Sequence, residues 1–270
     1  MLKYCIRLTG IIILGLALAS CEEVIDIDLN SEAPQIVIEA SLEASKTVFE
    51  VQVSETADYF DAGVQDPIDN ATVVLQDAAG TETLLSPVGD GRYRANIQPA
   101  VDQTYSLRVN IDGEVYEAKS YLPEAVTISA LELEYQSGGG PIEPGFQLFI
   151  NFQDDPAVTN YYRIKNSING SLQNTGDDLR VTDDRLFNGG EAHLPLFQTV
   201  FDAGDTVEIA LIHFDEQSFG YFDSLTDIVA NAQGPNAGTA APGNPNSNWT
   251  HGALGYFSAS SSSKQVIIVE

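Results

Sequence analysis

The feature that most restricts the fold of this chain is the alternation of apolar and polar residues in short segments. Residues 35–43 (QIVIEASLE), 47–55 (TVFEVQVSE) and 205–214 (DTVEIALIHF) show it clearly. A period of two residues is typical of β-strands that bury one face. Turn residues separate the segments, and Asp112-Gly113 is typical of a tight hairpin. Several short strands joined by turns, with no helix between them, predict an all-β fold built from antiparallel β-sandwiches.

The sequence predicts two such domains. Residues 35–124 are expected to form an N-terminal sandwich, which ends near Pro123, and residues 125–270 a second β-rich domain. The chain is expected to finish in two separate strands, GALGYFSAS and KQVIIVE, with a flexible loop at 260–263 between them.

One short helix is predicted in the second domain, at about 216–232. Its apolar residues recur at helical spacing, and Gly234 is a helix-ending residue. These apolar residues are Phe219, Phe222, Leu225, Ile228 and Val229.

The N-terminus resembles a lipoprotein signal peptide over residues 1–20. Lys3 and Arg7 precede an apolar run that is shorter than the roughly 20 residues needed to span a bilayer. The small residues of Leu18-Ala19-Ser20-Cys21 match a bacterial lipoprotein cleavage box. Cys21 is the only cysteine after this box, so no intramolecular disulfide can form in the mature chain. We therefore expect Cys21 to carry a diacylglyceryl group and an N-acyl chain, such as palmitate, which together anchor a protein stably.

Residues 21–34 follow as a lipid-proximal tether. Ile25, Ile27 and Leu29 alternate with Asp26 and Asp28, which is a strand pattern and not a linker pattern. The sequence therefore predicts a strand that begins close to the lipid.

The chain is strongly acidic, with a formal net charge of −27. This charge argues against nucleic acid as a partner, because phosphate binding depends on Lys and Arg. Aspartates at 58, 61, 66 and 69 could bind Ca²⁺ weakly, but they lack an EF-hand pattern, and a solvated loop is the alternative interpretation.

Catalytic motifs are absent from the sequence. No G-x-S-x-G elbow occurs, and His193, His213 and His251 are too far apart for a H-E-x-x-H zinc site. Paired acids are common in this chain, so they do not single out a glycosidase site. We predict no catalytic residue, no metal and no cofactor, and hence no enzyme activity.

One aromatic group is a candidate ligand or partner surface. Trp249, the only tryptophan, lies near His251, Tyr256 and Phe257 in a glycine-rich stretch. The alternative interpretation is that these side chains close the end of a sandwich, in which case they are buried.

Four stretches carry a resemblance to a known family. They are C-E-E-V-I-D-I-D-L with Q-I-V-I-E-A; A-T-V-V-L-Q-D…G-R-Y-R-A…Y-S-L-R-V; F-x-D-D-P-x-x-x-N-Y-Y-R at 152–163; and N-x-x-H-G-A-L-G-Y-F-S-A-S at 248–260. In this order they resemble a family of Bacteroidetes outer-membrane lipoproteins that is catalogued as a domain of unknown function. Residues 71–121 are also similar to small sandwich modules of the transthyretin or carboxypeptidase-regulatory type, which is a likeness of fold only. Both expected sandwiches are of the immunoglobulin or transthyretin kind.

The resemblance implies association with the outer membrane. It also implies a gene context beside TonB-dependent, SusC-like transporters, and no known reaction. Glu22 and Glu23, directly after Cys21, resemble a surface-export signal of such lipoproteins. The cell surface is therefore the expected location, in preference to the periplasmic face.

Three functions remain as hypotheses. The first is a non-enzymatic accessory or substrate-binding partner of a TonB-dependent transporter. The second is an autonomous surface protein that binds glycan or peptide, or mediates adhesion, through exposed aromatic residues. The third, which the sequence supports least, is a hydrolase with an unrecognised site.

Overall fold

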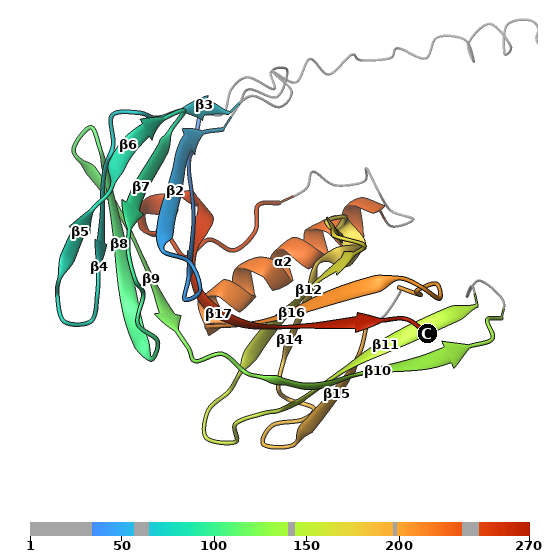
Figure 1. The fold of residues 1–270 in the computed structure, drawn as a ribbon. Coiled ribbons are helices and arrows are strands. Elements are labelled where there is room, and N and C mark those ends of the chain that lie inside the picture. The colour runs from blue at the N-terminus through green and yellow to red at the C-terminus, as the bar shows by residue number, and fades with distance from the viewer. Residues whose placement is uncertain (1–33, 57–64, 140–143, 197–198, 234–242) are drawn as a thin grey trace, which may run out of the picture.

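The computed structural model describes residues 34–56, 65–139, 144–196, 199–233 and 243–270. Strands form most of this part of the chain, and they pack as two sandwiches beside one α-helix (Figure 1). The prediction of an all-β fold with two sandwiches and one short helix in the second is confirmed.

The first sandwich packs a four-stranded sheet against one end of a ten-stranded sheet. The four-stranded sheet has the order β5-β4-β8-β9, with bounds Glu82–Leu84, Thr72–Gln76, Gln103–Ile111 and Glu114–Leu122. The opposing strands are β1 (Ile36–Glu43), β2 (Val48–Glu55), β3 (Asp66–Pro67), β6 (Ser86–Gly89) and β7 (Arg92–Asn96). Their alternating apolar residues meet between the two layers, as the period of two requires.

The second sandwich packs a three-stranded sheet against the other end of the ten-stranded sheet. The three-stranded sheet has the order β10-β11-β15, with bounds Ile128–Gln136, Gly145–Gln153 and Glu191–Pro195. The opposing strands are β12 (Tyr161–Ile168), β13 (Ser171–Leu172), β14 (Arg180–Asp183) and β16 (Thr206–Phe214). Two 3₁₀ turns complete the elements, η1 (Gly176–Asp178) and η2 (Thr250–Gly252).

A single long strand, β17 (Leu254–Ile268), joins the two sandwiches (Figure 1). Its first half pairs in parallel with β1, as far as Glu43 opposite Ser260. Its second half pairs antiparallel with β16, starting with Phe214 opposite Ser260. The expected loop at 260–263 is therefore wrong. These serines continue the strand because β1 and then β16 take up their backbone hydrogen bonds.

The C-terminal segment also contributes to the first core. Trp249, Ala253, Phe257 and Ala259 are buried among side chains of β1, β2, β4 and β8. The core of the sandwich expected at 35–124 thus includes residues that lie more than 100 positions beyond that range. The domain boundary expected near residue 124 rests on strands that follow one another along the chain, so it does not account for this long-range pairing.

Helix α2 (Glu216–Gln233) lies on the outer face of the ten-stranded sheet, next to β12, β14 and β17 (Figure 1). Tyr221 and Phe222 of the helix pack with Phe214 of β16 in a small core between the helix and the sheet. The carboxylate of Asp215 accepts hydrogen bonds from the backbone N–H of Ser218, at 2.9 Å, and of Tyr121, at 2.8 Å. Asp215 therefore caps the helix and also ties it to β9 of the first sandwich.

The expected signal peptide and the expected strand at 24–30 lie outside the described residues. Within the described ranges, no helix combines the length and the apolar character that a membrane span requires.

Candidate functional site

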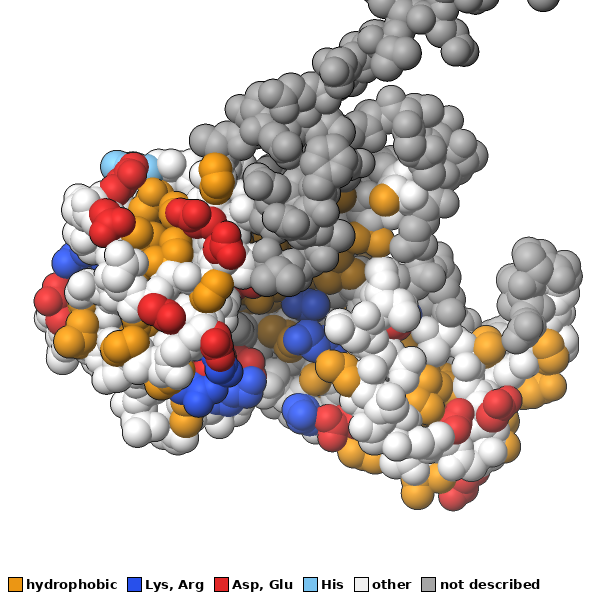
Figure 2. All heavy atoms as spheres, turned by 90° about the horizontal axis from the view of Figure 1, so that it is seen from above, with side chains coloured by type: hydrophobic (Ala, Val, Ile, Leu, Met, Phe, Trp, Pro, Cys, Tyr) orange, Lys and Arg blue, Asp and Glu red, His pale blue; other side chains and the backbone are white. Residues whose placement is uncertain are grey.

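A concave region on the outer face of the ten-stranded sheet gathers basic side chains. We call it the cationic hollow and define it by Lys46, Arg163, Lys165 and Lys264, with β17 serines on its floor. Its volume is about 280 Å³. Figure 2 shows Lys and Arg side chains in the hollow between the two lobes of the molecule. Four of the chain's 12 basic residues therefore meet in one place on a protein of net charge −27.

The strand pattern explains how this region forms. Arg163, Lys165 and Ser167 occupy alternate positions of β12 and so project from the same face. Ser258, Ser260 and Ser262 do the same on β17. Because the serine side chains are small, they leave the sheet surface open between the longer side chains around it.

Two of the four cations have carboxylate partners. Lys46 Nζ lies 2.7 Å from Glu43 Oε1, and Lys264 Nζ lies 2.8 Å from Glu208 Oε1. These pairs are partly exposed, and such pairs contribute little to stability. They stand at the rim of the hollow and leave its centre to Arg163 and Lys165.

Arg163 and Lys165 form no ion pair with a described carboxylate. The Arg163 guanidinium lies over the ring of Phe222, 4.1 Å from its centroid, and the buried Arg163 Nε has no hydrogen-bond partner. Burial lowers the pKa of Arg163. Burial, and then the charge of Arg163, lower the pKa of Lys165. Burial therefore destabilises the charged forms of both side chains, and the charge of Glu43 opposes this effect only partly at Lys165.

Replacing Lys165 with methionine should raise the free energy of unfolding at neutral pH by about 1 kcal/mol. This value is at the low end of the stabilisation that follows replacement of buried charged groups by apolar ones, because Lys165 is only half-buried. The lowered pKa means that the folded state disfavours the charged form. Wild-type stability should therefore rise as alkaline pH deprotonates Lys165, and the advantage of Lys165→Met should shrink. Urea denaturation at neutral and at alkaline pH measures both effects. Lys119→Met, at an exposed position of β9, is the control. Equal effects of the two substitutions would contradict the prediction.

Aromatic residues line one side of the hollow. Tyr256 packs on Tyr221, with ring centroids 4.6 Å apart, and on Phe222, at 5.2 Å. Burial raises the pKa of Tyr221 to about 12, and it also raises the pKa of Tyr256. Both phenols are therefore neutral at physiological pH, so the hollow combines two unpaired cations with an uncharged aromatic wall.

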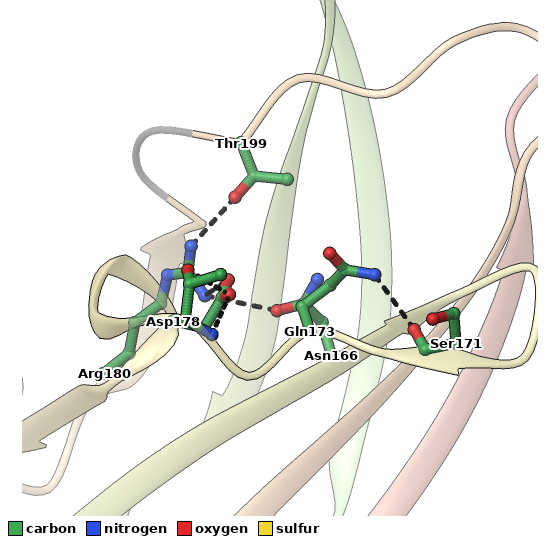
Figure 3. A network of polar contacts seen from close by, with 7 residues as sticks. Asn166, Ser171, Gln173, Asp178, Arg180 and Thr199 are labelled. Atoms are coloured by element: carbon green, nitrogen blue, oxygen red, sulfur yellow. Dashed lines mark hydrogen bonds and ion pairs between the residues drawn. The ribbon is translucent and has the colours of Figure 1, made fainter. Parts of the chain in front are cut away.

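Arg180, on the neighbouring strand β14, is a contrasting case. Its guanidinium donates to Asn166 Oδ1 and Asp178 Oδ1, each at 3.2 Å, and to Thr199 Oγ1 at 2.8 Å. Figure 3 shows this network, which ties the η1 turn to β12. Hydrogen bonds from Thr175 and from Arg180 lower the pKa of Asp178, although burial opposes them. This arginine is a structural residue, satisfied by its neighbours.

A second, more apolar pocket of about 780 Å³ lies between α2, β14 and β15. Leu179, Val181, Phe187 and Leu194 line it together with Arg180. Thr182, His193 and Thr226 in its lining have hydrogen-bond partners within the protein, and so has Arg180, so this pocket carries a weaker indication of a ligand than the cationic hollow does.

The aromatic residues singled out in the sequence do not form one surface. Trp249 is 6% exposed, and its indole Nε1 donates to the backbone oxygen of Ile38 at 3.0 Å. Phe257 is 0% exposed and packs near Phe49. Both side chains are buried in the first core, and Phe257 points there because residues 255, 257 and 259 of β17 face inward.

The other two members of that group are separated from each other. His251 is exposed, and its Nδ1 lies 3.4 Å from Glu114 Oε1. Tyr256 faces the opposite side of the sheet from Phe257 and alone reaches the cationic hollow. The alternative interpretation, in which aromatic residues close the sandwich end, describes Trp249 and Phe257.

Several predicted residues lie outside the described ranges. They include the lipidation site Cys21 and the sorting residues Glu22 and Glu23. They also include Asp58 and Asp61 of the acidic loop. Of the remaining aspartates in that loop, Asp69 accepts a hydrogen bond from the backbone of Gly91 at 2.7 Å.

The histidines are dispersed in the structure as in the sequence. His193 stacks on Phe149, and His213 Nδ1 lies 2.8 Å from the backbone oxygen of Glu124. Burial lowers the pKa of His213. Within the ranges that the structure describes, no three His, Cys, Asp or Glu side chains are close enough to hold a metal ion.

The cationic hollow was not identified from the sequence. A signal was present in Y-Y-R-I-K-N-S, where two cations occupy alternate positions of one strand in an acidic chain. The remaining members, Lys46 and Lys264, lie about 100 residues or more from this strand and are indistinguishable from surface lysines in the sequence.

Comparisons with known proteins add a family but no activity. A two-domain fibronectin type III segment of chicken tenascin is 8% identical over 88% of this chain and 100% of that chain, with a TM-score of 0.25. No curated protein matches the sequence. The model of the family described as "Domain of unknown function (DUF4249)" matches residues 22–266, and the chain therefore belongs to that family.

Proposed function

We propose that this chain is a non-enzymatic lipoprotein, anchored to the outer membrane through Cys21, that binds a ligand in the cationic hollow. In this proposal it acts as an accessory or substrate-binding partner of a TonB-dependent transporter. The supporting observation is the pair of unpaired cations, Arg163 and Lys165, at the centre of a concave site. Charged groups that are partly buried in a concavity without an ion-pair partner are a general indication of a functional site.

Binding fits the chemistry of the hollow better than catalysis does. None of the three histidines, the residue type that most often acts as a general base, lines it. Its carboxylates, Glu43 and Glu208, are already paired with lysines. The groups that remain can hold a ligand by charge and hydrogen bonding.

The architecture also suits an accessory role at a membrane. Because β17 is shared by both sandwiches, the hollow lies on a continuous sheet and its opposite walls are held in a fixed relation. The proposed surface location rests on Glu22 and Glu23 directly after the anchor. An autonomous glycan-binding protein would rely on exposed aromatic residues, and the burial of Trp249 and Phe257 removes that support.

Affinity purification from detergent-solubilised outer membranes tests the partnership. The tagged, acylated protein should recover a TonB-dependent β-barrel, whereas Cys21→Ser should release the chain from the membrane and lose the barrel. Recovery of the acylated protein without any β-barrel partner, even after chemical cross-linking, would overturn the proposed partnership.

A further inference from the structure

The sheet register places three cations around one small residue. Lys165 of β12 lies opposite Ala210 of β16, and Ala210 lies opposite Lys264 of β17. Neighbouring strands are about 5 Å apart, so the Cα atoms of the two lysines are about 10 Å apart with Ala210 between them. In the next row, Arg163 lies opposite Ile212.

This arrangement leaves a gap for a negatively charged group. The methyl of Ala210 occupies little of the space between the two lysine side chains, and Arg163 borders the same space from the adjacent row. Ser262, opposite Ile212, adds a hydroxyl to this region. A guanidinium, two ammonium groups and a hydroxyl are the donors that proteins use for carboxylate and phosphate oxygens.

We propose that the cationic hollow is a binding site for a small organic oxyanion, a carboxylate or a phosphate monoester, whose charged group lies above Ala210. The apolar part of the ligand extends along Phe222 and Tyr256, which line the same hollow. This inference rests on the proposed binding function and specifies its ligand class.

The internal acids do not already fill this role. Glu208 pairs with Lys264 at 2.8 Å, and Glu43 pairs with Lys46 at 2.7 Å, but neither forms an ion pair with Arg163 or Lys165. Glu39 lies further along β1, opposite Tyr256. Four basic and two acidic side chains line the hollow, so its own charge is positive although the chain is acidic.

A substitution at Ala210 tests the electrostatics without knowledge of the natural ligand. Ala210→Glu places a carboxylate beside Lys165 and should raise the melting temperature relative to Ala210→Gln, which has nearly the same shape and no charge. Both substitutions fill the gap and should abolish binding. If Ala210→Glu is no more stable than Ala210→Gln, the hollow has no unsatisfied positive charge and the proposal fails.

Binding is measured directly by calorimetry on the purified, detergent-solubilised full chain. The probes are phenyl phosphate and inorganic phosphate at millimolar concentration, with chloride as the background anion. Phenyl phosphate should bind more tightly because its ring reaches Phe222 and Tyr256. Lys165→Gln should lower the affinity for phenyl phosphate at least tenfold. Arg108→Gln, which removes an exposed arginine of β8, should leave this affinity unchanged.

The outcomes separate the two proposals. Absence of heat with both probes, or equal affinity of wild type and Lys165→Gln, overturns the oxyanion site. Recovery of a transporter would still support the accessory function in that case. Conversely, tight binding that depends on Lys165, together with failure to recover any β-barrel, supports the site and overturns the partnership.

Discussion

A fragment of residues 35–124, the whole range that the sequence assigns to the first sandwich, is expected not to fold on its own. It lacks Trp249 and Phe257, which are buried in the core of that sandwich. Large-to-small changes at buried aromatic positions each cost about 3–5 kcal/mol, and typical domains are stable by only about 5–15 kcal/mol. The fragment also loses the parallel partner of β1. Circular dichroism during urea titration should show no cooperative transition.

Restoring the missing segment provides the control. The same fragment, extended by residues 243–260 through a Gly/Ser linker of about 20 residues, can supply both the strand and the two aromatic side chains. This extended fragment should recover a cooperative transition. A cooperative transition in the unextended fragment would show that the C-terminal segment is dispensable for the first core.

Replacing Gly255 with alanine is expected to lower the free energy of unfolding by about 2–5 kcal/mol, the sum of backbone strain and overpacking. Gly255 has a φ of +85°, which disfavours any residue with a Cβ atom. An added Cβ would lie 2.8 Å from the carbonyl carbon of Ile38 and still closer to its oxygen. The paired strand β1 cannot move away without losing its register with β17.

Gly252 is a matched control for this prediction. Its φ is +72°, but an added Cβ would have no neighbour within 4 Å. Gly252→Ala should therefore show only the conformational strain, about 1–2 kcal/mol. Urea denaturation of both variants separates strain from steric overlap. Equal losses of stability in the two variants would show that the close approach to Ile38 does not matter.

The local elements could be predicted because their causes are local. Alternating residues in 35–43 and 47–55 form β1 and β2, and the helix expected at about 216–232 is observed at Glu216–Gln233. In each case one periodic face supplies the apolar side chains of a core. Turn residues end the strands, and Asp215 caps the start of the helix.

The long-range features could not be predicted in the same way. The pairing of β17 with both β1 and β16 depends on residues far away in the chain, and its serines have neither the apolar pattern nor the propensity of a central strand. The inward orientation of Phe257 follows from this pairing. A single sequence identifies an aromatic group but does not indicate which side of a sheet it faces.

The candidate site could not be predicted either, because it also depends on long-range strand pairing. Lys165 and Lys264 lie near each other only because β16 pairs with both of their strands and places the small residue Ala210 between them. Neither lysine belongs to a motif, and the overall acidity of the chain directs attention away from its cations. Their significance depends on the sheet order, which required the structure.

The pairing of β17 with both β1 and β16 also determines when folding can be completed. Ile38 must meet Gly255, more than 200 residues later, after β1 has already formed its local hairpin with β2. Contacts this distant in sequence slow folding, because loop closure precedes any gain from pairing. In the interval β1 has an open strand edge, which is a template for association with other chains. A newly synthesised molecule is therefore most vulnerable to aggregation before residues 254–260 are paired, and its folding rate should depend on that step.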